Sequence, residues 1–316
     1  MVRPDKLYIV VPCYNEEEVL PETVRRLEEK LRSLIRRELA AEGSRILLVD
    51  DGSRDRTWAL ITRFHNDSPL VAGLKLAHNR GHQNALLAGL MVAKDRCGVT
   101  ISLDADLQDD MDAMDEMLDQ FYNGCDIVYG VRNDRATDTA FKRGTALAFY
   151  RLMAALGAET VYNHADYRLM SRRALEGLSE YREVNLFLRG LVPMIGYRTG
   201  VVEYRRGERL AGESKYSLAR MLNFAVDGIT SLSVRPIRLM AGLGALLLLG
   251  GGVWLLALLV LFLMGRQVAG LTVVLASLWT IAGLQLAGLG LVGEYIGKVY
   301  LEAKGRPRYR IEEDLD

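Results

Sequence analysis

Short apolar runs alternate with helical patterns over the first part of the chain. The apolar runs are LYIVVP (7–12), ILLVD (46–50), LVAGLKL (70–76), VTISLD (99–104) and DIVYG (126–130). Apolar residues at helical spacing fill the stretches between them: about Glu17 to Arg37, a stretch from about Thr57, Gln83 to Lys94, and Asp112 to Tyr122. Alternation at this spacing predicts an α/β fold, a mostly parallel sheet with helices on both faces.

Two long uncharged runs follow, from Leu239 to Gly265 and from Val268 to Gly293. Each exceeds the roughly 20 residues that cross a ~30 Å hydrocarbon layer, so we predict a transmembrane hairpin rather than a pair of buried core helices. Positive charge on both outer flanks predicts a multi-pass protein of the cytoplasmic membrane with both termini in the cytoplasm. The flanking residues are Arg235 and Arg238 before the hairpin, and Lys298, Lys304, Arg306, Arg308 and Arg310 after it.

The stretch Tyr216 to Val234 separates the α/β part from the hairpin. Its apolar residues follow helical spacing, which predicts an amphipathic helix that lies in the membrane interface or packs on the soluble domain. We therefore expect a catalytic domain over 1–212, interfacial helices over 213–236, the hairpin over 237–296 and a basic cytoplasmic tail over 297–316.

Composition narrows the classes of protein. Lys and Arg together number 40, as do Asp and Glu, so the net charge is zero and we expect no nucleic-acid partner. The three cysteines lie far apart, which argues against a disulfide framework or a thiolate metal site. The apolar run at 7–12 is too short for a secretory signal, so we expect the first domain to stay in the cytoplasm.

Polar clusters follow three of the predicted strands directly: VPCYNEEE, LLVDDGSRD and SLDADLQDD. Ligands of parallel sheets bind beyond the carboxyl ends of the strands. Asp104 and Asp106, with Gln108 beyond them, offer the oxygen ligands that suit Mg²⁺ or Mn²⁺, and such an ion bridges the oxygens of a diphosphate. No dinucleotide-binding GxGxxG follows the first predicted strand, and a P-loop GxxxxGK[ST] is missing from the sequence.

With these motifs the chain resembles the family 2 glycosyltransferases, which have the GT-A fold, a Rossmann-like α/β fold. The resemblance is closest to the polyisoprenyl-phosphate glycosyltransferases and extends over essentially the whole chain, including GESKYS (212–217) and GEYIGKVYLEAKGRPRY (293–309). It implies a metal-dependent enzyme that moves one sugar from a nucleotide-sugar to undecaprenyl or another polyprenyl phosphate at the cytoplasmic face of the membrane.

The resemblance also implies a set of site residues. The nucleotide-sugar site would comprise Pro12, Tyr14, Glu16, Val49, Asp51, Asp104, Ala105, Arg132, Arg209 and Lys215. The metal ligands would be Asp104, Asp106 and Gln108, and the catalytic residues would be Asp106, Arg132 and Asp166. Arg135, Lys142 and Lys215 would draw in the acceptor phosphate.

The implied reaction is a single displacement that inverts the anomeric carbon. The metal at Asp106, with Arg132 or Arg209, would neutralise the leaving diphosphate. A phosphate monoester has a second pKa of about 6, so the acceptor is ionised at neutral pH and a strong base is not needed. Asp166 could accept a proton, orient the acceptor phosphate or pair with Arg168. We expect His82 to brace the loop on the nucleotide side.

The donor is less defined than the reaction. Similarity to bactoprenol glucosyltransferases favours UDP-glucose, while GDP-mannose and other UDP-sugars use the same chemistry. A processive polysaccharide synthase is disfavoured because QxxRW is missing, and a non-catalytic subunit is disfavoured because DADLQ and GESK are intact. Glycine-rich uncharged runs suit a homo-oligomer, and the family resemblance favours a tetramer.

Overall fold

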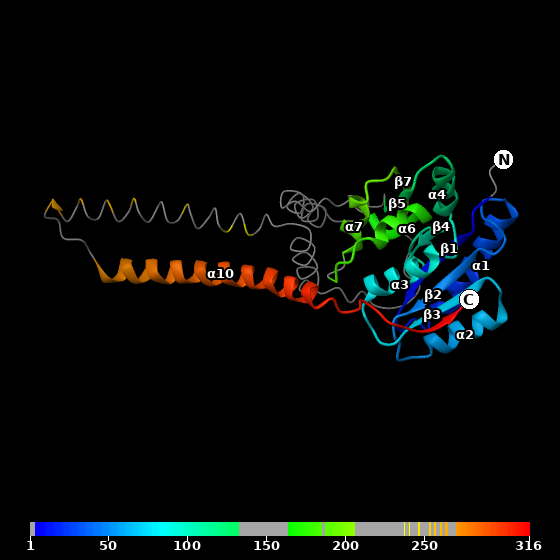
Figure 1. Ribbon diagram of the computed structural model, residues 1–316, viewed down its shortest axis with the longest axis horizontal. Coiled ribbons are helices and arrows are strands. Elements are labelled where there is room, and N and C mark those ends of the chain that lie inside the picture. The colour runs from blue at the N-terminus through cyan, green and yellow to red at the C-terminus, as the bar shows by residue number, and fades with distance from the viewer. Residues whose placement is uncertain are drawn as a thin grey trace. The chain divides into compact units, whose positions relative to one another are not determined.

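The computed structural model describes residues 4–132, 164–184, 187–205 and 270–316, together with isolated positions between 237 and 264. The chain divides into two compact units (Figure 1). Residues 1–151, 159–217 and 306–316 form the first unit, and residues 152–158 and 218–305 form the second.

The first unit contains a sheet of eight strands among the described residues, in the order β7-β5-β6-β4-β1-β2-β3-β8. The strands are β1 (Leu7–Cys13), β2 (Arg45–Asp50), β3 (Val71–Leu76), β4 (Val99–Ser102), β5 (Ile127–Arg132), β6 (His164–Ser171), β7 (Thr199–Tyr204) and β8 (Ile311–Leu315). The helices are α1 (Leu20–Arg36), α2 (Thr57–Asp67), α3 (His82–Lys94), α4 (Ala113–Tyr122), α6 (Arg172–Ser179) and α7 (Leu188–Met194).

The four strands β1 to β4 are mutually parallel where they pair, as the alternating pattern predicted. β6 lies between β4 and β5 and is antiparallel to both, so the sheet is mixed in its second half. β5 and β7 are again parallel. The arrangement fits the α/β fold of the GT-A type that the sequence predicted.

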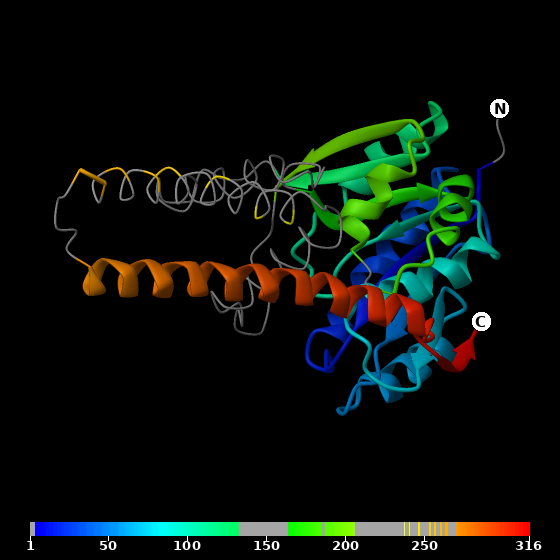
Figure 2. The ribbon, with the colours of Figure 1, turned by 60° about the vertical axis from the view of Figure 1, so that its left-hand side comes forward.

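Alternate residues of β1 face opposite sides of the sheet, as the pleat of a strand requires. Leu7, Ile9 and Val11 belong to a buried cluster with residues of α1, α2 and α4. Tyr8 and Val10 belong to a second buried cluster with residues of α3, α6 and α7. Full burial of such a side chain contributes about 1.5–3 kcal/mol, so both faces hold the sheet in place. The helices on the two faces can be followed in Figure 2.

β8 brings the end of the chain back to the first unit. It pairs antiparallel with β3, with Gly73 opposite Leu315 and Lys75 opposite Glu313. Ion pairs reinforce the edge, since Arg96 Nη2 lies 2.6 Å from Asp314 Oδ2. The last residues are therefore part of the first unit's sheet.

The prediction of a transmembrane hairpin was wrong. In the part of the chain that the structure describes, no helix combines the length and the apolar character that crossing a membrane needs. The second uncharged run forms α10 (Leu271–Lys304), which continues beyond it through Glu294, Lys298, Glu302 and Lys304. The prediction relied on the length of the uncharged run and did not anticipate this continuation. The predicted location, a multi-pass membrane protein with both termini in the cytoplasm, depended on this hairpin and was wrong as well.

Other expectations concern residues that the structure does not describe. These residues include most of the first uncharged run, the stretch Tyr216 to Val234 for which an amphipathic helix was predicted, and the basic residues Arg235 and Arg238.

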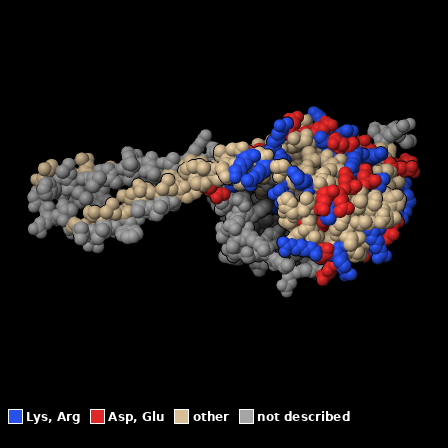
Figure 3. All heavy atoms as spheres, turned by 60° about the horizontal axis from the view of Figure 1, so that its bottom comes forward, with Lys and Arg blue, Asp and Glu red and all other residues tan. Residues whose placement is uncertain are grey.

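On the face of the first unit seen in Figure 3, acidic and basic side chains are interspersed, in keeping with the zero net charge.

Candidate active site

The carboxyl ends of β1, β2 and β4 meet at one edge of the sheet. Cys13 pairs with Asp50, and Val10 pairs with Ser102. The three polar clusters of the sequence follow these strand ends directly, so the fold brings together segments that are far apart along the chain.

The loops after β1 and β2 are tied to each other by backbone-to-side-chain hydrogen bonds. The Asn15 amide donates to Ser53 Oγ at 3.0 Å, and the Arg54 amide donates to Asn15 Oδ1 at 2.8 Å. The Glu16 amide donates to Thr57 Oγ1 at 2.9 Å. Asn15 adopts a left-handed φ of 54°, which an Asn tolerates well. These bonds fix the rim of the site on its β1–β2 side.

The residues expected at the nucleotide differ in their access to a ligand. Tyr14 is 41% exposed at the rim. The side chains of Pro12 and Val49 are buried in the sheet, and Val49 belongs to the core beneath α3. These two residues shape the base of the site rather than offer it a side chain.

Asp51 is buried and braces the loop that precedes α3. Its Oδ1 accepts the Arg80 amide at 2.7 Å, and its Oδ2 accepts the Gly81 amide at 2.8 Å. Burial raises the pKa of Asp51, although these two hydrogen bonds act in the opposite direction. Gly81 has a φ of 87°, which favours glycine, and His82 begins α3 directly after it.

The DADLQ segment follows β4 and forms the centre of the edge. Leu107 adopts a φ of 58°, and Asp106 Oδ1 accepts the Gln108 amide at 3.2 Å. Thr23 on α1 donates to the Ala105 carbonyl at 2.8 Å, which holds the segment against the first helix. The Asp104 side chain is one-third exposed, and burial raises its pKa against the opposing effect of His82.

The donor set at Asp104 and Asp106 fits a hard divalent cation that completes its shell with other oxygens. No cluster of three or more His, Cys, Asp or Glu side chains within the described ranges is arranged to hold a metal ion. Mg²⁺ is commonly held by one or two carboxylates together with waters and substrate phosphates. Asp104 and Asp106 would hold such an ion together with waters or the oxygens of a bound diphosphate.

Asp166 is contacted by cationic side chains from more than one element. Arg168 Nη2 donates to its Oδ1 at 2.6 Å, and Arg189 Nη2 donates to its Oδ2 at 3.2 Å. His82 Nε2 lies 3.3 Å from Asp166 Oδ2 and 3.6 Å from Asp104 Oδ1. Burial alone would raise the pKa of Asp166, but His82, Arg189 and Arg168 outweigh it and lower that pKa well below its ordinary value.

Arg132, at the end of β5, donates to Tyr204 and to Asp109, among other contacts. Its Nε donates to the Tyr204 hydroxyl at 3.1 Å, and its Nη2 donates to Asp109 Oδ1 at 3.3 Å. The Tyr204 hydroxyl also donates to Asp109 Oδ1 at 2.5 Å. The side chain of Asp109 is buried, and its other oxygen has no hydrogen-bond partner among the described residues. The DADLQ segment and Arg132 are thus joined through Asp109.

The sequence did not point to Asp109, Tyr204 or Arg189 as site residues. Asp109 lies in the acidic run after DADLQ, which gave a weak signal, whereas Tyr204 and Arg189 reach the site only through the topology of the sheet. Pairing of Asp166 with Arg168, one of the alternatives left open, is observed. Four expected residues lie outside the described residues: Arg135, Lys142, Arg209 and Lys215.

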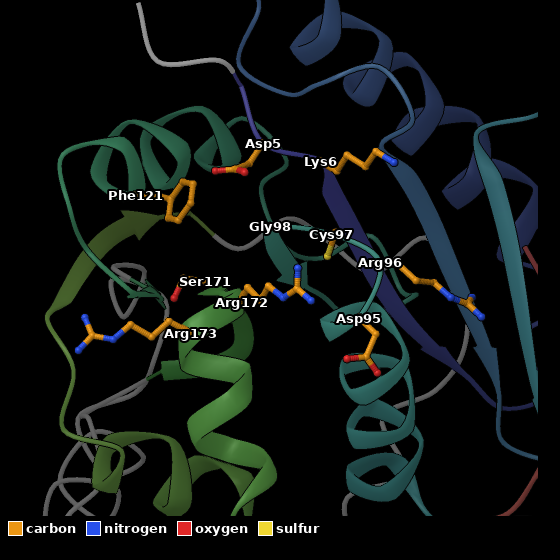
Figure 4. A pocket seen from close by; sticks show the side chains of 10 residues that line it. All are labelled: Asp5, Lys6, Asp95, Arg96, Cys97, Gly98, Phe121, Ser171, Arg172 and Arg173. Carbon is orange, nitrogen blue, oxygen red and sulfur yellow. The ribbon is translucent and has the colours of Figure 1, made fainter.

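Two hollows lie near the sheet. One of about 490 Å³ is lined by Lys6, Gly98 and Arg172 among others and lies at the amino ends of β1 and β4, away from the polar clusters (Figure 4). The other, of about 350 Å³, is lined by Gln108 and Asp109 among others and lies beside the DADLQ segment. Only the second adjoins the candidate active site.

Comparison with known proteins identifies the family of this chain. Residues 8–179, more than half of the chain, match the family described as glycosyl transferase family 2. An uncharacterized glycosyltransferase of Bacillus subtilis (strain 168), YkoT, is 53% identical, and the match covers 98% of this chain and 92% of the relative. The bactoprenol glucosyl transferase of Shigella phage SfX is 38% identical, with 97% and 99% covered.

Among solved structures, the mannosyltransferase PcManGT from Pyrobaculum calidifontis, in complex with GDP-Man and Mn²⁺, is 17% identical. That match has a TM-score of 0.47 and covers 96% of this chain and 86% of the other. The family match and the near full-length similarity to curated relatives lead to one conclusion. This chain belongs to glycosyl transferase family 2.

Proposed function

We propose that this chain transfers a single glucose residue from UDP-glucose to a polyprenyl phosphate, with inversion at the anomeric carbon. The observation that carries the proposal is the similarity to bactoprenol glucosyl transferases over nearly the whole chain, for example 37% identity to that of Shigella phage SfV over 98% of this chain. Similarity of this extent includes the segments beyond the family domain. Residues 1–212 would then contain the catalytic domain.

The donor would bind at the edge formed by the ends of β1, β2 and β4. The exposed ring of Tyr14 and the loops that carry Glu16 and Asp51 would then contact the nucleotide. Asp104 and Asp106, with Gln108, would hold Mg²⁺ or Mn²⁺ together with the diphosphate of the donor. A divalent ion there supplies charge neutralisation for the leaving nucleoside diphosphate.

Arg132 would stabilise the same leaving group. Tyr204 and Asp109 fix its guanidinium through Nε and Nη2, so little reorganisation is required when negative charge develops on the diphosphate. Arg209 and Lys215 would complete the cationic surroundings of the diphosphate, as the family resemblance implies.

The acceptor side requires positioning more than proton transfer. With a second pKa of about 6, a phosphate monoester is already an anionic nucleophile at neutral pH. Arg135, Lys142 and Lys215 would attract this anion. Holding it in line with the anomeric carbon would lower the barrier by making the attack effectively unimolecular.

A panel of radiolabelled UDP- and GDP-sugars, offered with undecaprenyl phosphate and Mg²⁺ or Mn²⁺ in detergent, tests the proposal. UDP-glucose should label the lipid, whereas GDP-mannose and UDP-N-acetylhexosamines should label it much less. Replacement of Asp106 by Asn should lower the rate by a factor of about 100 or more, since it removes charge at the metal. Asp112→Asn, at an 88% exposed side chain of the same loop, should retain the wild-type rate. Preference for another sugar would reassign the donor, and formation of polymer would replace the proposal with a processive synthase.

A further inference from the structure

His82 is the first residue of α3, and its backbone is fixed from both sides. The residues before it are held by the buried Asp51 carboxylate, which accepts the Arg80 and Gly81 amides at 2.7 and 2.8 Å. After it, the Ala85 amide donates to the Gly81 carbonyl at 3.1 Å, and Ala85 packs in the buried cluster under α3. A backbone held in this way leaves the imidazole few alternative positions.

The His82 imidazole lies between two carboxylates that come from different strands. Its Nε2 is 3.3 Å from Asp166 Oδ2 on β6 and 3.6 Å from Asp104 Oδ1, which follows β4. The two strands are joined at this point, since Ser102 Oγ donates to the Asp166 carbonyl at 2.6 Å. Neighbouring carboxylates repel each other unless a donor or a cation lies between them. Nε2 therefore carries a hydrogen, because a lone pair there would repel both.

Asp166 is the fixed member of this pair. Arg168 Nη2 donates to it at 2.6 Å, and Arg189 Nη2 at 3.2 Å. The Gln83 amide links it to the start of α7, since its Nε2 donates to Asp166 at 3.4 Å and its Oε1 accepts the Leu188 amide at 3.0 Å. Asp166 is also only 4% exposed. A carboxylate in these surroundings supports the imidazole beside it and is poorly placed to take a proton from a substrate.

Asp104 is held much less firmly. Its side chain is one-third exposed. Among the residues that the structure describes, His82 is the only ion-pair or hydrogen-bond partner of the Asp104 carboxylate. The imidazole therefore connects a carboxylate that several side chains fix in place to one that depends on the imidazole alone.

We propose that His82 is a positioning residue of the metal site: its imidazole, supported by Asp166, sets the orientation of the Asp104 carboxylate. The inference rests on the proposed function and names a residue that acts through an expected metal ligand. Carboxylates that bind metal ions are commonly oriented by outer hydrogen-bond partners, and loss of such a partner costs about 10- to 100-fold in metal affinity or activity. Asp166 then contributes through the imidazole rather than as a base.

The affinity for Mn²⁺ tests this role without reference to catalysis. The quantity measured is the Mn²⁺ concentration that half-saturates UDP binding to the full chain, by calorimetry. His82→Ala should raise this concentration about tenfold or more. Weak UDP binding in the presence of EDTA should stay unchanged, because Asp104 acts only through the metal. An equal loss of UDP binding with and without Mn²⁺ would show that the imidazole contacts the nucleotide itself, and would overturn the proposal.

Two further variants separate positioning from a general loss of structure. His65→Ala removes an imidazole whose Nδ1 is hydrogen-bonded to the Val71 carbonyl at 2.8 Å, away from the site, and it should leave the Mn²⁺ requirement unchanged. His82→Gln places an amide N–H at a reach similar to that of Nε2, so it should recover most of the Mn²⁺ affinity. A folded His82→Gln variant as weak as His82→Ala would contradict orientation through a hydrogen-bond donor.

A double-mutant cycle tests whether Asp166 acts through His82. The losses of Mn²⁺ affinity caused by Asp166→Asn and His82→Ala should not add, since both free the same carboxylate. An Asp166→Asn variant with wild-type Mn²⁺ affinity and a lowered kcat would overturn the proposal in favour of a base.

Glucose transfer is scored separately from metal binding. An active enzyme whose Mn²⁺ affinity is unchanged by His82→Ala would refute the positioning role alone. A wild-type protein that binds Mn²⁺ and UDP but glucosylates no polyprenyl phosphate would refute the proposed function instead.

Discussion

Arg132 depends on residues that approach it from distant parts of the chain. The Tyr204 hydroxyl links the Arg132 Nε to Asp109, and Tyr167 packs edge-on against the Tyr204 ring at a centroid distance of 5.2 Å. Burial comes first among the causes that raise the pKa of Tyr204, and the nearby Asp109 adds to it, so the hydroxyl stays protonated and can donate. The orientation of Arg132 is therefore set by a neutral phenol and a carboxylate.

Replacement of Tyr204 by Phe should loosen Arg132 while leaving the ring in place. We expect kcat/KM for the nucleotide-sugar to fall about tenfold and the free energy of unfolding to fall by about 1 kcal/mol, through loss of one buried hydrogen-bonding group. The matched control is Tyr122→Phe, whose hydroxyl donates to the Leu39 carbonyl away from the site. It should lower stability similarly and leave kcat/KM unchanged, and equal kinetic effects of the two changes would contradict a role for Tyr204.

The lowered pKa of Asp166 predicts how the free energy of unfolding depends on pH. Its pKa is lower in the folded protein than the value of about 3.9 expected for an unfolded chain. Such a group stabilises the fold above its unfolded pKa, and this contribution is lost as the pH falls through the folded pKa. The difference in unfolding free energy between wild type and Asp166→Asn should thus be constant above about pH 5 and shrink below about pH 4. Urea denaturation over this range measures it, and a pH-independent difference would argue against the lowered pKa.

At the scale of elements, β8 is the clearest case of a structure that the sequence did not reveal. The segment reads IEEDL, with acidic side chains that a strand prediction disfavours. Its pairing with β3 is stabilised by contacts far apart in sequence, such as Lys75 with Glu313 and Arg96 with Asp314. Local patterns carry no information about partners more than 200 residues away.

Removal of residues 311–316 should expose the edge of β3. We expect the melting temperature to fall by several degrees and the protein to aggregate more readily, because an uncovered edge strand offers unpaired backbone groups. Thermal unfolding with light scattering measures both effects. Glu312→Gln, which keeps the strand and changes one exposed edge residue, is the control, and a truncated chain as stable as the control would show that β8 does not support the sheet.

The parallel part of the sheet was predictable because each of its strands is an apolar run buried on both faces. β1, β2, β3, β4 and β5 all fall on the runs read from the sequence. β6 was missed as a strand because HADYRLMS mixes buried polar residues with apolar ones: Asp166 and Arg168 are buried there as an ion pair. A buried ion pair hides the hydrophobic pattern on which strand prediction depends.

At the scale of the whole molecule, the motifs at the strand ends predicted where the candidate site lies. Its remaining residues are brought there by contacts between elements that are distant in the sequence. The sequence placed Asp104, Asp106 and Asp51 at one edge, since each follows a parallel strand. The cluster of His82, Arg189 and Asp166 arises from packing of α3, α7 and β6, which no local pattern encodes. The uncharged runs were over-interpreted as membrane spans, since run length alone does not define the helix that forms.

Transfer of radiolabelled glucose from UDP-glucose to undecaprenyl phosphate tests the central claim most directly. The account predicts a labelled lipid whose mass exceeds that of the acceptor by one hexose residue. Its formation should stop on chelation of divalent cations and resume when Mg²⁺ or Mn²⁺ is restored. An unlabelled lipid in the presence of a protein that still binds UDP-glucose, or a labelled polymer, would contradict it.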